Sequence, residues 1–222
     1  MKVLIGYSTC EITRLAFESV GCEAWTCDLR PSTTNNHIQQ DIWEVLDGGH
    51  WDFALLHPMC TYLTVSAAWA FKDGPYHLKV SEEILVGEKR REARQRDLDN
   101  FSRLLDLPFP VAIENPASSF VNKYLRPSDQ IIHPWMFGDD ASKATGLWLT
   151  KGTPKLIVDS KLFYPPRLVT IKDRSYSRWS NQTDSGQNRL PPSKDRWLTR
   201  SKTYPGFAYA AGLQWGQWLL SK

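Results

Sequence analysis

A thiol and a carboxyl group that could act together on one substrate each lie at the end of an apolar segment. Cys60 follows the run 52–57 on a turn that contains Pro58, and Glu114 lies near the end of the run 110–116. A cysteine on an open turn near a helix start can have a lowered pKa and act as a nucleophile. A nearby carboxyl group can stabilise charge that develops on the substrate. A cysteine alone is more often inert packing, so the prediction depends on its pairing with Glu114.

A second set of polar residues suggests a cofactor site. Ser8, Thr9, Cys10 and Glu11 follow the first apolar run, and Asp28 follows the second. A loop that opens a helix offers free N–H groups to an anion, and an acid at the end of the next strand can bind ribose hydroxyls. The loop holds no GxGxxG motif, which disfavours a dinucleotide. A nucleoside-containing cofactor such as S-adenosylmethionine (SAM) remains open, as does a plain turn or capping role for Asp28.

Strands that alternate with helices must position these residues. Short apolar runs predict the strands, and residues spaced three to four apart predict the helices. The strands are expected at 3–6, 23–27, 52–57 and 110–116, and the helices at 12–20 and 41–46. This alternation predicts a parallel, doubly wound α/β sheet, in which ligands bind beyond the carboxyl ends of the strands. All four polar positions fall at such ends.

The rest of the chain is less regular. The periodicity predicts a long helix at 81–107, whose mixed-charge middle at 88–96 is expected to be a solvated face. Further strands are expected at 147–149 and 155–158, and a final helix at 208–220.

The segment 172–202 is strongly basic. It holds eight Lys or Arg against three Asp, a net charge of +5, whereas the whole chain carries +3. Its aromatic residues are Tyr176, Trp179 and Trp197. A polar basic loop with aromatic side chains is typical of contact with a phosphate backbone and unstacked bases. A solvated insertion is the alternative.

Composition excludes several classes of protein. Hydrophobic residues make up 41% and charged residues 23% of the 222 residues, which argues against disorder. No apolar run approaches the roughly 18 residues that span a bilayer, and the N-terminus is a poor secretory signal. The four cysteines are expected to be reduced thiols, three of them buried, and no metal site is expected. His57 and His133 precede prolines and are expected to be structural. We therefore expect a cytoplasmic protein.

Five motifs occur in an order that is similar to one known family. They are Cys-Asp-Leu-x-Pro-Ser at 27–32, Glu-Asn-Pro at 114–116, Gln-x-x-x-Pro-Trp-x-Phe-Gly at 130–138, Lys-x-Thr-Gly-Leu-Trp-Leu at 143–149 and Thr-Tyr-Pro-Gly-x-Ala at 203–208. With the turn 57–61 around Cys60, they resemble compact, phage-type members of the DNA cytosine-5 methyltransferase family. The chain departs from that family in its glycine-free loop 8–11 and in Met59, which replaces a second proline.

This resemblance implies a fold, a reaction and a set of site residues. The fold is the Rossmann-like class I SAM-dependent methyltransferase fold, in one catalytic domain over 1–222, with possible DNA-contacting insertions at about 66–97 and 172–202. Cys60 would add to C6 of a flipped cytosine while Glu114 holds the base, and C5 would take the methyl group of SAM. The implied cofactor-binding residues are Ser8, Thr9, Cys10, Glu11, Asp28, Asp41 and Pro58, and the implied DNA-binding residues are Asn115, Lys143, Arg178, Arg200 and Lys202.

Other functions remain open at this point. The same Cys60 and Glu114 pair could transfer a different one-carbon unit, or act on a nucleotide or RNA. The chain could instead be a catalytically silent nucleic-acid-binding protein of phage origin, such as a decoy. If it is of phage origin, its compartment is the cytoplasm of a bacterial host, and the partner is double- or single-stranded DNA.

Overall fold

A seven-stranded mixed sheet forms the centre of the structure, a computed structural model that describes residues 1–76, 84–191, 193 and 196–222. The order of its strands is β3-β2-β1-β4-β5-β7-β6, and only β7 runs antiparallel to its neighbours. The strands are β1 (Lys2–Gly6), β2 (Glu23–Cys27), β3 (His37–Ile38), β4 (Phe53–Leu56), β5 (Val111–Pro116), β6 (Gln130–Ile132) and β7 (Thr145–Leu149). The predicted α/β class with a mostly parallel sheet is confirmed.

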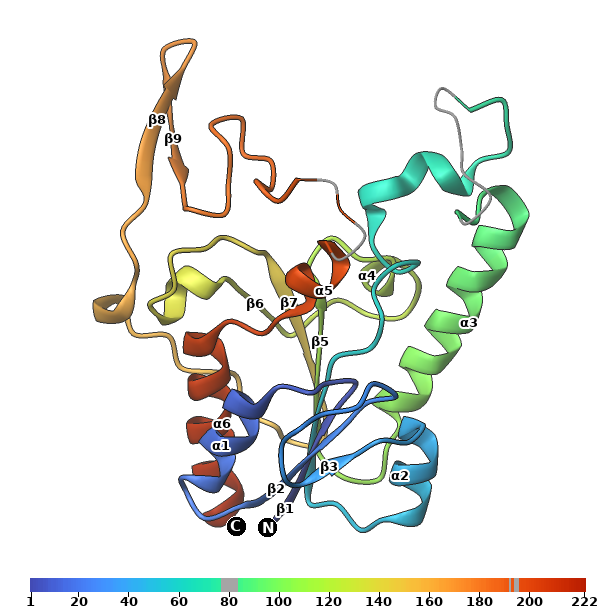
Figure 1. Cartoon of the computed structure of the whole chain (residues 1–222), viewed down its shortest axis with the longest axis vertical. Coiled ribbons are helices and arrows are strands. Elements are labelled where there is room, and N and C mark those ends of the chain that lie inside the picture. Colours follow the sequence, from blue (N-terminus) through green and yellow to red (C-terminus); the bar gives the residue numbers. More distant parts are fainter. Residues whose placement is uncertain (77–83, 192, 194–195) are drawn as a thin grey trace.

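Helices cover both faces of this sheet (Figure 1). One face carries α1 (Glu11–Glu18) and α6 (Pro205–Leu220), and the other carries α2 (Ile42–Gly48) and α3 (Gly87–Leu105). The strands feed both cores because successive side chains point to opposite faces. In β4, Phe53 and Leu55 pack with α6, whereas Leu56 packs with α2 and α3. This two-sided burial is the reason that the strands read as continuous apolar runs.

The segment predicted as a strand at 155–158 is not one. Leu156 is 3% exposed but Ile157 is 77% exposed. Their backbone N–H groups donate to side-chain oxygens, that of Leu156 to Gln130 at 2.9 Å and that of Ile157 to Gln214 at 2.7 Å. Two glutamine amides thus satisfy the backbone that a neighbouring strand would otherwise pair, and the prediction is wrong for that reason.

The long helix differs from its prediction in extent and in burial. It begins at Gly87, and part of the predicted start (81–83) lies outside the described residues. Its charged middle is only partly solvated, because Arg90 is 6% exposed. The Arg90 guanidinium lies 4.8 Å from the ring of Phe71, and that of Arg94 lies 4.9 Å from the ring of Phe120. These cation–π contacts bury Arg90 and partly bury Arg94, two arginines that the charge pattern assigned to solvent.

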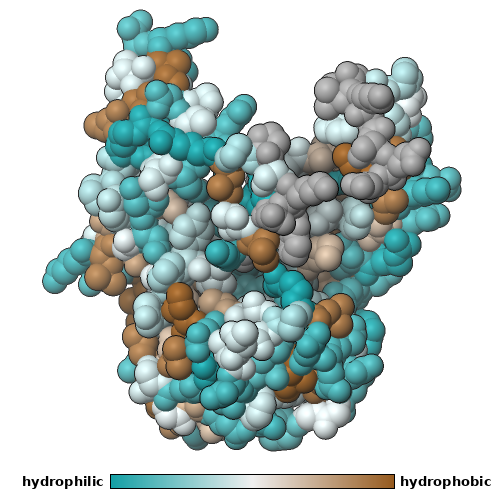
Figure 2. All heavy atoms as spheres, in the orientation of Figure 1, coloured by the Kyte–Doolittle hydropathy of each residue, from teal (hydrophilic) through white to brown (hydrophobic). Residues whose placement is uncertain are grey.

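Two arms rise above the carboxyl-end edge of the sheet, and the space-filling view is hollowed between them (Figures 1 and 2). One arm is a hairpin of β8 (Arg167–Ile171) and β9 (Arg174–Arg178). The other consists of η1 (Val65–Phe71) and the first turns of α3. The remaining elements are α4 (Val121–Tyr124), η2 (Pro134–Phe137), η3 (Ser160–Leu162) and α5 (Arg196–Ser201).

The hairpin was not predicted, because the segment 172–202 has the composition of a loop. Lys172 and Asp173 form its two-residue turn, with φ angles of 44° and 62°, as a type I′ turn requires. None of the helices in the described part of the chain has the length and apolarity needed to cross a membrane.

Candidate active site

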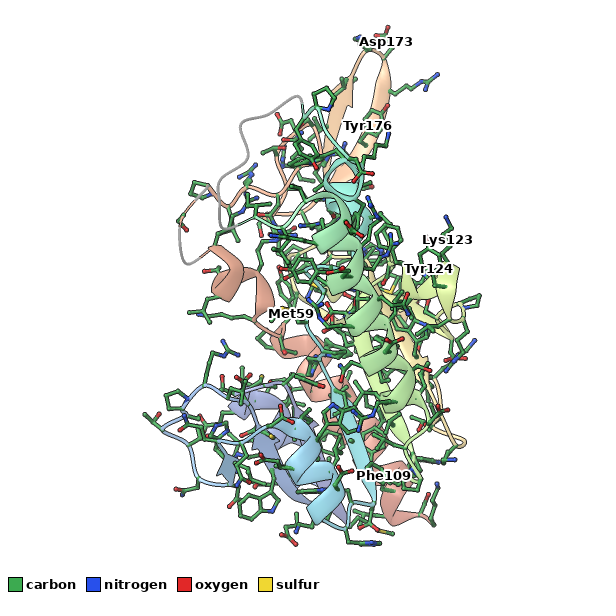
Figure 3. All side chains as sticks on the ribbon, turned by 90° about the vertical axis from the view of Figure 1, so that its right-hand side faces the viewer. Met59, Phe109, Lys123, Tyr124, Asp173 and Tyr176 are labelled. Atoms are coloured by element: carbon green, nitrogen blue, oxygen red, sulfur yellow. The ribbon has the colours of Figure 1, made fainter. Side chains whose placement is uncertain are left out.

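Cys60 lies on a loop after β4 that neighbouring segments hold in place. The Asn115 side chain donates from Nδ2 to the carbonyl oxygen of Pro58 at 3.0 Å, and both residues are buried. Further along the loop, the Phe120 N–H donates to the carbonyl oxygen of Leu63 at 2.7 Å. Cys60 itself is exposed. Figure 3 shows its neighbour Met59 between the hairpin tip at Asp173 and the opposite end of the sheet at Phe109. The loop thus holds an exposed cysteine just beyond the end of β4.

Glu114 lies on the adjacent strand, β5, and its two oxygens are both occupied. Oε2 accepts a hydrogen bond from His57 Nδ1 at 2.9 Å, and Oε1 accepts one from Lys143 Nζ at 3.4 Å. The carboxylate side chain is 15% exposed. Burial acts to raise the pKa of Glu114, but the charge of Lys143 and the hydrogen bond from His57 outweigh it and lower the pKa to about 2. Glu114 is therefore ionised at neutral pH.

The Cys60 thiol lies within the electrostatic field of the same group. Removal of water from the sulfur raises the pKa of Cys60, and the negative charge of Glu114 adds to the effect. The positive charges of Lys143 and Arg200 oppose it without reversing it. The expected lowering of this pKa is therefore wrong for the protein alone. The finding still places four predicted residues in one electrostatic cluster: Cys60, Glu114, Lys143 and Arg200.

A pocket lies beside this cluster. Glu114 and Lys143 form one wall, and Lys202 and Tyr204 of the segment that joins α5 to α6 form another. Its interior is only about 20 Å³, room for about one water molecule, and its other lining residues are Ile132, Pro134, Thr145, Thr203 and Phe207. The negative charge of Glu114 raises the pKa of Lys143, and burial opposes the rise. The pocket thus brings one carboxylate and two lysines together beside apolar side chains.

A second, larger pocket lies where the strand order reverses, between the ends of β1 and β4. It encloses about 240 Å³, somewhat below the roughly 300–1,000 Å³ that is usual for small-ligand sites. Its walls are mainly aromatic and apolar, with two carboxyl groups and an amide among them. The lining residues are Tyr7, Asp41, Ile42, Trp43, Pro58, Met59, Asp97 and Asn100. In a doubly wound sheet such a switch point is the usual place for a nucleotide, and two predicted cofactor residues, Asp41 and Pro58, lie in it.

The predicted cofactor loop adjoins this second pocket but does not line it. Tyr7 makes the turn after β1 with a φ of 57°, a conformation that usually requires glycine. Ser8 is buried and its N–H donates to the carbonyl oxygen of Cys27 at 2.9 Å. Thr9 and Cys10 are half-buried, and Glu11 is exposed and pairs with Arg14 at 3.3 Å. The loop therefore reaches the edge of the sheet without the glycines of the family pattern.

Asp28 lies at the end of β2, as predicted, but it already has a partner. Its oxygens accept hydrogen bonds from Arg30 Nε at 3.1 Å and from Arg30 Nη2 at 3.0 Å. Burial acts to raise the pKa of Asp28, and the hydrogen bonds from Arg30 outweigh it and lower the pKa. A ribose at this carboxylate would have to share it with the guanidinium.

Two residues, Asn115 and His57, differ from their predicted roles. Asn115 is 1% exposed, so its side chain supports the Pro58 turn. Arg178, whose predicted DNA contact stays a prediction, lies on β9, where its Nε donates to the carbonyl oxygen of Asp184 at 2.9 Å. His57, expected to be only structural, contacts Glu114 directly. Sequence could not reveal this, because the two residues are 57 positions apart.

Asp97 was also missed, because it sits in the charged stretch of α3 and shows no motif. The four cysteines are free thiols, and Cys22 and Cys27 are buried as expected.

Comparison of the chain with protein-family models and with curated proteins found no match.

Proposed function

We propose that the protein transfers a methyl group from SAM to C5 of cytosine in DNA, with Cys60 as the nucleophile. The observation that carries this proposal is the electrostatic coupling of Cys60 to Glu114 at the ends of the adjacent parallel strands β4 and β5. A base between them would meet the thiol at its edge and the carboxylate at its polar side. The sequence resemblance assigns these roles to the same two residues.

The chain's own groups account for the steps of this chemistry. The Cys60 thiolate adds to C6 of cytosine, and the electrons of the C5–C6 double bond move onto C5. N3 takes a proton from water, and ionised Glu114 stabilises the resulting positive charge and accepts a hydrogen bond from the exocyclic amine. Lys143 and Arg200 favour the thiolate through their charge. After C5 has gained its substituent, water takes the C5 proton, the electrons of that C–H bond re-form the C5–C6 double bond, the cysteine leaves as a thiolate, and N3 returns its proton to water.

The pocket at the β1–β4 switch point is the proposed binding site of SAM. When bound, SAM would supply the methyl group as an electrophile. The rings of Trp43 and Pro58 and the apolar side chain of Ile42 suit an adenine ring, and the buried Oδ2 of Asp97 has no partner among the described residues, which suits a ligand with N–H donors. Asp41 keeps one oxygen available, since only Oδ1 accepts the Trp43 N–H.

The two arms support DNA as the substrate. The hairpin carries Arg167, Lys172, Arg174 and Arg178 against Asp173 alone. Such a basic two-stranded ribbon has the dimensions to enter the major groove. A duplex held between the arms would lie over the loop of Cys60, which a cytosine must reach by leaving the base stack.

Methyl transfer tests the proposal directly. The protein is incubated with tritiated SAM and DNA of mixed sequence, both single-stranded and duplex, and radioactivity in the DNA is measured. We expect incorporation with the native chain, none with Cys60→Ala, and native levels with Cys22→Ala, a buried cysteine at the opposite edge of the sheet. Incorporation by Cys60→Ala would exclude Cys60 as the nucleophile.

A catalytically silent nucleic-acid-binding protein is the second candidate. It is favoured by the raised pKa of Cys60 and by a Glu114 carboxylate that His57 and Lys143 already occupy. Such a protein would bind DNA as tightly after Cys60→Ala as before it. Neither the native chain nor the variant would transfer a methyl group.

A further inference from the structure

One carboxyl group in the switch-point pocket has no role in the chemistry above. Asp97 lines that pocket from α3, and its Oδ2 is buried without a hydrogen-bond partner among the described residues. The neighbouring polar groups are already paired with one another. Asn100 Oδ1 accepts from Trp43 Nε1 at 2.9 Å, and Asn100 Nδ2 donates to Tyr7 Oη at 3.2 Å. Nothing in this network donates to Asp97.

An unpaired buried carboxyl oxygen costs free energy that a suitable ligand can recover. Burial raises the pKa of Asp97 to about 6, and the charge of Arg96 opposes the rise. The group is thus poorly solvated, yet it faces a cavity with room for a ligand. A bound group that offers an N–H to Asp97 would supply the missing hydrogen bond.

Asp41 lines the same cavity from the N-cap position of α2. Its Oδ1 caps the helix by accepting the Trp43 N–H at 2.8 Å, so one oxygen remains for a ligand. The pocket therefore offers two carboxyl acceptors, Asp41 and Asp97, between flat apolar walls that include Trp43 and Pro58. An aromatic ring that bears an amino group matches this pattern, because an amine carries two N–H donors in the plane of the ring.

We infer that Asp97 is a specificity-determining residue that, together with Asp41, makes this pocket select adenine by its exocyclic amine over a purine with a carbonyl group there. The inference rests on the proposed function in that the adenine belongs to SAM. A purine that presents oxygen at this position offers only its ring N1–H in place of the two N–H donors of the amine, and it opposes the second carboxyl group with the lone pairs of its oxygen.

Calorimetry with four probes tests this inference: S-adenosylhomocysteine, its inosine counterpart, adenosine and inosine. The native chain should bind each adenine compound at least tenfold more tightly than its hypoxanthine counterpart. In Asp97→Asn, whose amide can donate to a carbonyl, this ratio should fall at least tenfold. Asp99→Asn is the matched control, since Asp99 is exposed on the same helix and accepts from Gln95. It should keep the native ratio.

Each outcome separates the inference from the proposed function. If S-adenosylhomocysteine binds and Asp97→Asn keeps the native ratio, the inference fails while the cofactor assignment stands. If adenosine shows the expected affinity ratio over inosine but S-adenosylhomocysteine binds no more tightly than adenosine, the SAM assignment fails and the inference stands. Binding of no probe to the native chain contradicts both. If Asp97 were purely structural, Asp97→Asn would weaken the binding of all four probes equally. Only a change in the ratio of adenine to hypoxanthine affinity therefore supports selection.

Discussion

His57 Nδ1 and Glu114 Oε2 form a hydrogen bond of 2.9 Å across the ends of β4 and β5. The carboxylate can only accept here, so His57 donates from Nδ1. This bond and the charge of Lys143 keep Glu114 ionised, with a pKa of about 2. Two residues, one at each oxygen, thus keep the Glu114 carboxylate ionised.

Replacement of His57 should change the acid limb of the pH profile. In His57→Leu one of the interactions that lower the pKa of Glu114 is lost, so the pKa rises toward the ordinary value of 4.5. The acid limb of kcat should move to higher pH, whereas kcat at neutral pH should change little, because Glu114 stays ionised there. His57→Asn, which retains a donor, should reverse part of this shift. His133→Leu is the control, because His133 bonds Ser142. Equal profiles for His57→Leu and His133→Leu would contradict the role.

Loss of Lys143 should make the thiol less acidic. Its charge lowers the pKa of Cys60, against the effects of burial and of Glu114. In Lys143→Met, alkylation of Cys60 by iodoacetamide should reach its half-maximal rate at a higher pH than in the native chain, by about one unit. Lys123→Met, which removes an exposed lysine beside Tyr124, should leave the curve unchanged. An unshifted curve in Lys143→Met would show that the two groups are not coupled.

Asp97 should lower stability at neutral pH. Its pKa is about 6 in the folded chain, above the ordinary value of 3.8. A raised carboxyl pKa means that the folded state holds the proton more tightly, so stability falls as pH rises from about 4 through about 6. Asp97→Asn should therefore raise the free energy of unfolding by about 1–3 kcal/mol at pH 8 and by little at pH 4. Urea unfolding at the two pH values measures the difference. An equal gain in unfolding free energy at pH 4 and pH 8 would show that the charge of Asp97 does not cause the loss of stability.

The hairpin tip should contribute to DNA binding through charge. Lys172→Asn with Arg174→Gln removes two exposed positive charges and keeps a residue that tolerates the positive φ at 172. Affinity for duplex DNA should fall, and the slope of log K against log salt should decrease in magnitude by about two. Lys151→Asn with Lys123→Gln is the matched control, since Lys151 is also exposed with a positive φ of 47°. An equal loss in both double variants would indicate only a nonspecific effect of net charge.

Much of the sheet could be predicted because its strands are buried on both faces. The continuous apolar runs of β1, β4 and β5 are typical of buried strands and fit few other elements. The same reasoning failed at 155–158, since glutamine side chains took the place of a neighbouring strand. It also missed the hairpin, whose exposed strands have no apolar pattern.

The site was predictable only where a residue type itself suggests chemistry. Cys60, Glu114 and Lys143 were predicted from their types and motifs, and they do lie together. His57 and Asp97 were missed because their importance depends on partners and cavities that only the folded chain creates. Asn115 shows the reverse case, in which a residue in a motif turns inward to support the turn.

A covalent adduct with DNA tests the central claim most directly. The native chain is incubated with SAM and DNA in which every deoxycytidine is replaced by 5-fluorodeoxycytidine, and the mixture is examined by denaturing electrophoresis and mass spectrometry. Fluorine at C5 cannot leave as a proton, so the enzyme should remain bonded to the base through Cys60, with one methyl group added. Absence of the adduct on both single-stranded and duplex DNA, from a protein that binds both SAM and DNA, would contradict nucleophilic catalysis by Cys60.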